Sequence, residues 1–259
     1  MSTYGYLVVE GPQDVEFAYR LLKPFGLGRI QHFSKLKPFW VDLVPTKYPP
    51  DDDLQKRVPV PLFLQSKTHS IAIHSAGGDS RIAATIEETA AIIRVEKVTG
   101  IGVILDSDSE FTPAVRHDRV KKEMESIQSR EFTLPNTPGD VGVGVPRLGI
   151  YVLPDNRTLG TLEDLLLECG RDVYPELLRS AEAHVHNAAS DKSLIEADMR
   201  EFSRSSGRKK AIVGAIASIL RPGRAVQNSI QDNRWLQAES LSIPRVKAVQ
   251  DFLARLFDL

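Results

Sequence analysis

The sequence predicts an α/β protein with a mostly parallel, four-stranded sheet, flanking helices and a helical C-terminal extension. Four short apolar segments, rich in β-branched and aromatic residues, alternate with stretches whose apolar residues recur at helical spacing. Strands that alternate with helices usually pair in parallel, because each helix carries the chain back across the sheet. Beyond about residue 169 the apolar spacing is helical only, which predicts the extension.

The individual elements follow from this pattern and from turn residues at their ends. The predicted strands are residues 4–9, 70–74, 101–105 and 148–153. Helices are predicted at residues 13–22, 80–97 and 113–129, at a segment beginning after Thr161, and then at 175–187, 209–220 and 244–257. At the fourth of these helices, Thr161 and Asp164 have the spacing of a capping box.

We expect two parts, an α/β core at residues 1–168 and a mainly helical extension at 169–259 that packs on it. Residues 28–67 interrupt the core with six prolines and an acidic run. This composition predicts a long insertion that contains short extended pieces. Loops of such length are usually functional or mobile, although a proline-stiffened surface loop explains the same residues.

Bulk composition limits the environment and the partners. The 259 residues carry a formal net charge of -1, so any affinity for nucleic acid requires a local basic patch. A single cysteine, Cys169, excludes an intramolecular disulfide and fits a reducing compartment. The sequence has no apolar run near the ~20 residues of a membrane span, and its start does not resemble a signal peptide. We therefore expect a cytoplasmic protein with no membrane partner.

Acidic residues follow two of the predicted strands. Glu10 follows the first strand, and Asp106 and Asp108 follow the third. Ligands of parallel sheets bind beyond the carboxyl ends of the strands. Residues two apart in an extended segment point the same way, so Asp106 and Asp108 could direct both carboxylates at one cation. Magnesium prefers such hard oxygen ligands, and the pattern predicts a site for Mg²⁺ or Mn²⁺.

These residues carry a resemblance to Toprim domains, which occur in topoisomerases, bacterial primases and OLD-type nucleases. VVEGPQDVEF resembles their first motif and VILDSDSE resembles their Asp-x-Asp motif. Glu10 matches the motif-one glutamate, and Asp106 and Asp108 match the paired aspartates. The EGxxD pattern with Asp14 is similar to that of OLD-like and uncharacterised Toprim-like proteins, and the layout of the whole chain resembles the latter.

The resemblance implies a Mg²⁺-dependent phosphodiester hydrolase or a nucleic-acid-processing protein, with DNA or RNA as its partner. It implies that Glu10 is a metal ligand or a general acid/base. Further metal-site acids would be Asp14 and, in GTLEDLLLE, Glu163 and Asp164. The OLD-type pattern also contains a catalytic lysine, matched here by Lys209 or Lys210. The chain lacks a Walker motif, a topoisomerase tyrosine context and a primase zinc segment, which leaves activity of the chain alone open.

The densest basic segment is the second candidate for contact with nucleic acid. Arg208, Lys209 and Lys210 follow Arg204 within seven residues, and we expect them to contact phosphates. The alternative is a solvated helix start. Positive charge at the start of a helix opposes the helix dipole, which favours a functional explanation.

Two other functions stay open. One is a non-catalytic Toprim-like module that binds a nucleotide, nucleic acid, a protein partner or a second copy of the chain. The other is a phosphatase of the haloacid-dehalogenase type with Asp106 as nucleophile, because these enzymes share the hydrophobic-DxD string. They usually carry it on the first strand, followed by threonine, whereas here Ser109 and Glu110 follow. The acids themselves also suit ordinary turns and helix starts.

Overall fold

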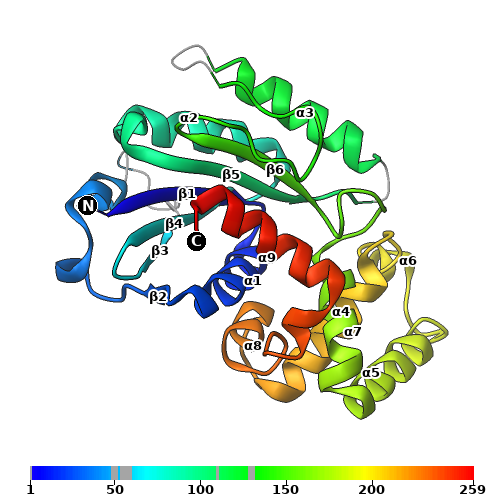
Figure 1. The fold of residues 1–259 in the computed structure, drawn as a ribbon. Coiled ribbons are helices and arrows are strands. Elements are labelled where there is room, and N and C mark those ends of the chain that lie inside the picture. Colours follow the sequence, from blue (N-terminus) through cyan, green and yellow to red (C-terminus); the bar gives the residue numbers. More distant parts are fainter. Residues whose placement is uncertain (1, 48–51, 53–59, 109–110, 128–131) are drawn as a thin grey trace.

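A six-stranded mixed sheet with helices on both faces forms the centre of the protein, which confirms the α/β class (Figure 1). The computed structural model describes residues 2–47, 52, 60–108, 111–127 and 132–259. The strand order is β2-β3-β4-β1-β5-β6. The strands are β1 (Thr3–Val9), β2 (Gly28–Arg29), β3 (Leu62–Gln65), β4 (His69–Ser75), β5 (Val98–Asp106) and β6 (Arg147–Leu153).

The expectation of a four-stranded, mostly parallel sheet is wrong. The four predicted strands correspond to β4, β1, β5 and β6, which are parallel neighbours. The predicted insertion supplies β2 and β3, which extend one edge in antiparallel pairing. These strands have only two and four residues, so they are too short for an alternating pattern to reveal them. Residues 48–51 and 53–59 of the insertion lie outside the described part.

Nine α-helices are found in the described residues, and they agree with the predicted helices within a few residues except where noted. They are α1 (Pro12–Leu22), α2 (Ile82–Ile92), α3 (Pro113–Glu125), α4 (Leu162–Val173), α5 (Pro175–Ala188), α6 (Glu196–Met199), α7 (Gly207–Leu220), α8 (Val226–Asp232) and α9 (Pro244–Phe257). Helix α2 is shorter than predicted, and α6 and α8 were not predicted. The predicted end of α3 reaches residues 128–131, which lie outside the described residues. No described helix has the length and apolarity that a membrane crossing requires.

Two hydrophobic layers cover the sheet, because successive residues of β1 point to opposite faces. Tyr6 and Val8 face the layer of α2 and α3. Leu7 and Val9 face the layer of α1, α4 and α9. Helices α4 to α8 gather past the carboxyl ends of the parallel strands (Figure 1), and α4, α7 and α8 supply one wall of the site described below.

Glycines let α9 lie very close to the sheet. A Cβ atom at Gly100 on β5 would lie 2.4 Å from the carbonyl oxygen of Leu256, and one at Gly149 on β6 would lie 2.8 Å from the Phe252 ring. Real Cβ atoms do not approach other atoms this closely, so side chains here would push the helix away. The C-terminal helix therefore shares one core with the N-terminal strands.

Candidate functional site

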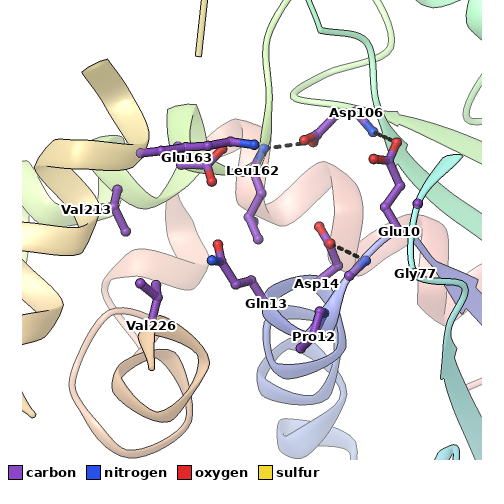
Figure 2. Close-up of a pocket in the computed structure, with 13 residues that line it drawn as sticks. Glu10, Pro12, Gln13, Asp14, Gly77, Asp106, Leu162, Glu163, Val213 and Val226 are labelled. Atoms are coloured by element: carbon purple, nitrogen blue, oxygen red, sulfur yellow. Dashed lines mark hydrogen bonds between the residues drawn. The ribbon is translucent and has the colours of Figure 1, made fainter. Parts of the chain in front are cut away.

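Glu10 and Asp106 meet at the carboxyl edge of the sheet. They stand at the ends of β1 and β5, which are adjacent parallel strands. The backbone N–H of Asp106 donates a hydrogen bond to Oε1 of Glu10 at 3.0 Å (Figure 2). The juxtaposition expected from the order of the strands is therefore present.

A glycine turn fixes the end of β1. The backbone N–H groups of Gly77 and Gly78 both donate to the carbonyl oxygen of Glu10, at 2.9 and 3.0 Å. Both glycines have positive φ, at 78° and 135°, a region that side chains disfavour. The turn after β4 thus holds the backbone from which the Glu10 side chain projects.

Four acidic side chains line one pocket of about 420 Å³ beyond the strand ends. Glu10 and Asp106 come from the sheet, Asp14 from the first turn of α1 and Glu163 from the first turn of α4 (Figure 2). Oδ1 of Asp106 accepts a hydrogen bond from the Leu162 N–H at 2.9 Å, which ties β5 to the start of α4. Elements far apart in sequence thus bring their carboxylates to the same space.

The ionised form of this cluster is unfavourable. Burial raises the pKa of Glu10 to about 7, against the hydrogen bond from Asp106 and the charge of Arg116, which lower it. Burial, and then neighbouring carboxylates, raise the pKa of Asp14 and of Asp106. Clustered carboxylates in a low-dielectric site either take up protons or need a cation to offset their charge. The pocket therefore favours positively charged ligands.

Glu163 has an unpartnered oxygen in this setting. The residue is only 4% exposed, and its Oε2 atom is buried without a hydrogen-bond partner among the described residues. A buried carboxylate oxygen without a partner is costly, and such atoms in native proteins often mark the place of an ion or a water. Glu163 is therefore a candidate ligand on the α4 side of the pocket.

Arg116 of α3 is a central site residue that the sequence did not reveal. Its side chain is 5% exposed and donates to Glu10 at 3.3 Å and to Asp79 at 2.6 Å. Its Nε donates to the Asp106 carbonyl oxygen at 3.1 Å, and the Arg116 side chain lowers the pKa of Asp79. In the sequence it stands in a polar helix beside Arg119, and nothing distinguishes the two. Only the position of α3 against the sheet selects Arg116.

Asp108 lies apart from the carboxylate cluster, contrary to the expectation that it shares one cation with Asp106. The chain leaves the extended conformation here, because Asp108 has a φ of 57°. The rule that residues two apart point the same way applies only to extended segments. Its side chain is 47% exposed, lines a different pocket, and lies 3.6 Å from Arg116.

The basic segment lies beside the acidic pocket. Lys210 of α7 lines the pocket together with Glu10 and Asp106. Lys209 pairs with Asp164 at 2.7 Å, and Asp164 also accepts the N–H of Thr161 at 2.9 Å, as the capping spacing predicted. Asp164 is thus engaged in helix capping and in holding α7. Asp14 makes the equivalent contact with the Gly11 N–H at 2.9 Å.

Arg208 is turned differently from the two lysines that follow it. Its guanidinium lies over the ring of Phe202, 5.6 Å from the ring centre. Of the three basic residues predicted to contact phosphates, the structure places Lys210 at the acidic pocket, Lys209 against α4 and Arg208 against the segment before α7.

No complete set of metal ligands is assembled in the conformation described. Within the described residues, no three His, Cys, Asp or Glu side chains form a group that could hold a metal ion. The nature of the donors nevertheless suits a hard cation, because carboxylate oxygens converge and Oε2 of Glu163 has no partner. A change of side-chain rotamers would be needed to complete coordination.

The fold and the site define an α/β protein with a carboxylate pocket at the strand ends. The chain belongs to the DUF3226 family, described as a protein of unknown function, which it matches over residues 4–258. Among solved structures it is similar to the crystal structure of hypothetical protein PH0156 from Pyrococcus horikoshii OT3. The two share 16% identity and a TM-score of 0.52 over 98% of this chain and 95% of the other, a likeness of fold alone. No curated protein matches the sequence.

Proposed function

We propose that the protein is a Mg²⁺-dependent phosphodiester hydrolase acting on nucleic acid, with a Toprim-like arrangement of its sheet. One observation carries this proposal. Carboxylates from the ends of β1 and β5 and from the start of α4 line the same pocket as Lys210. A phosphate in this pocket would touch a cation site and a lysine together, and both stabilise the negative charge that develops on a phosphate during cleavage.

Glu10, Asp106 and Glu163 are the residues that would hold the metal, with Asp14 beside them. When bound, Mg²⁺ or Mn²⁺ supplies a positive charge that stabilises the oxygens of a reacting phosphate. The raised pKa values of Glu10, Asp14 and Asp106 support this assignment, because burial and then neighbouring carboxylates disfavour their ionised forms, and a bound cation would offset both effects. Asp108 lines the neighbouring pocket and would need to rotate to contribute.

The remaining residues have distinct roles in this proposal. Lys210 offsets the negative charge that develops on the phosphate. Lys209 orients α7 through its ion pair with Asp164, so it is a positioning residue. The alternative role for Glu10, in a site where it does not coordinate the metal, is general acid/base, because its pKa of about 7 lies in the range in which proton transfer at neutral pH is efficient.

The test is cleavage of labelled single- and double-stranded DNA and RNA by the full chain, with Mg²⁺ or Mn²⁺ and with EDTA. We expect metal-dependent cleavage that Asp106→Asn and Glu163→Gln abolish and that Lys210→Ala slows about a hundredfold or more. Glu182→Gln, on the exposed side of α5, is the matched control and should cleave like the wild type. In parallel, Mg²⁺ should raise the melting temperature of the wild type but not of Asp106→Asn. A wild type with neither metal response would refute the proposal.

A second candidate function is a non-catalytic binding module, and Arg116 is the observation that favours it. This buried guanidinium pairs with Glu10, Asp79 and Asp108 and so offsets part of the negative charge at the strand ends. A module of this kind would bind nucleic acid equally well in EDTA and in Mg²⁺, and it would cleave none of the four substrates. The same assay therefore separates the two functions.

A further inference from the structure

A second pocket, of about 900 Å³, adjoins the acidic one. Residues of α3 and of the loop before it form one wall, and residues 201–211, which lead into α7, form the other. Lys210 lines both pockets, and Arg116 lines the second while it contacts Glu10 of the first. A chain-like ligand could therefore pass from one pocket into the other. The volume lies within the roughly 300–1,000 Å³ of typical ligand sites.

The lining of this second pocket combines aromatic rings with cations. Phe111 stands before α3, is 43% exposed and lines this pocket, so part of its ring is accessible to a ligand. Phe202 lies on the opposite wall. The cationic side chains of the lining are Arg116, Arg119, Arg204 and Lys210.

Most of the charges in the pocket are paired, but one cation is left over. Arg116 pairs with Asp79 and Asp108, and Arg204 pairs with Glu201 at 2.9 Å. Lys210 forms no ion pair with any described residue and lies at the junction of the two pockets. The free positive charge is thus located where a phosphate that bridges the pockets would lie.

Phe202 is held in place by its surroundings. A Cβ atom at Gly207 would lie 2.3 Å from the Glu201 carbonyl oxygen and 2.4 Å from that of Phe202, so only glycine lets the segment fold onto the start of α7. The Arg208 guanidinium lies over the ring of Phe202. A positioned aromatic ring costs little entropy when a ligand stacks on it.

We propose that this second pocket binds an unpaired base of a single-stranded nucleic acid, whose neighbouring phosphate lies on Lys210. The proposal rests on the proposed function for the identity of the ligand, and it adds the strand preference. Base stacking on aromatic rings needs a base whose face is free, and bases inside a duplex do not offer one. Phe111 and Phe202 supply the stacking surfaces, and Lys210, the cation without an ion pair among the described residues, binds the phosphate.

The experiment measures binding without catalysis. A short fluorescein-labelled DNA oligonucleotide and its RNA equivalent, each single-stranded or annealed, are titrated with the full chain in EDTA at low salt and followed by fluorescence anisotropy. We expect single strands to bind more tightly than duplexes. Phe202→Ala and Phe111→Ala should each weaken single-strand binding about five- to 150-fold, the range that loss of one stacked base produces. Phe202→Tyr keeps the ring and should keep the affinity.

The matched control is Phe33→Ala, because Phe33 is 55% exposed and does not line the second pocket. This variant should bind like the wild type. The inference is overturned if the wild type binds no single strand, if it binds duplexes as tightly, or if both pocket variants keep wild-type affinity. Binding with the expected pattern but without metal-dependent cleavage would support the inference and refute the proposed hydrolase. Metal-dependent cleavage together with unchanged binding in both pocket variants would support the proposed hydrolase and refute the inference.

Discussion

Replacement of Glu10 by glutamine tests the electrostatics of the acidic pocket. Glu10 is mostly buried, and its pKa rises from 4.5 to about 7 in the folded protein. The folded state thus holds the proton more tightly than the unfolded chain, and the side chain begins to destabilise the fold as the pH rises above 4.5. The full cost is present above pH 7. At about 1.4 kcal/mol per pKa unit, it amounts to roughly 3 kcal/mol.

Between pH 5 and pH 8 the single group accounts for about 2–3 kcal/mol of lost stability, from the two pKa values and linkage. The Glu10→Gln variant retains an acceptor for the Asp106 N–H but cannot ionise. We therefore expect the free energy of unfolding of the wild type to fall by about 2–3 kcal/mol more than that of the variant over this interval. Urea unfolding in EDTA, followed by circular dichroism at several pH values, measures both. Parallel curves for the two proteins would show that burial does not raise this pKa.

Two further predictions concern stability, and both are read from urea unfolding at neutral pH. Arg116→Met should lower the free energy of unfolding by about 3–5 kcal/mol, because it leaves buried Glu10 without its cation. The half-exposed Arg119→Met should lower it by less than about 1 kcal/mol. Equal losses in the two variants would contradict the role assigned to Arg116. Gly100→Ala should cost about 1–3 kcal/mol, because its Cβ would lie 2.4 Å from a carbonyl oxygen of α9. A Cβ atom added at Gly214 in α7 meets open space, so Gly214→Ala should raise the free energy of unfolding by about 0.5–1 kcal/mol. A Gly100→Ala variant as stable as the wild type would mean that α9 does not pack as described.

The sequence predicted the elements with strong periodicity and missed those without it. Helix α9 was predicted with its observed limits, Pro244–Phe257, because its apolar face repeats over four turns and proline begins it. The two-residue β2 gave no pattern at all. Helix α2 ends at Ile92, earlier than predicted, because Ile93 adopts an extended conformation. Local spacing indicates long elements, but short edge strands depend on the neighbour with which they pair.

In the acidic site, too, some residues could be predicted from local patterns and others could not. Glu10 and Asp106 could be predicted because each follows an apolar strand, whereas Asp14 and Glu163 were implied only by the resemblance to Toprim domains. Their roles in metal binding or catalysis remain predictions. The expectation that Asp106 and Asp108 share one cation rested on an extended backbone, whereas Asp108 has a left-handed φ and lines the neighbouring pocket. Asp108 also forms a bridge with Gly160, a contact between segments far apart in the chain.

By itself, the sequence determined the α/β class, the four parallel strands and the carboxylates at their ends, because all of these follow from local patterns of apolar and acidic residues. Only the tertiary structure decided which side chains meet. It selected Arg116 over Arg119 as the buried cation, joined Lys209 to Asp164, and placed Phe202 opposite Phe111. The physical reason is that burial and charge pairing depend on contacts between segments far apart in the chain, and no local spacing encodes those distances.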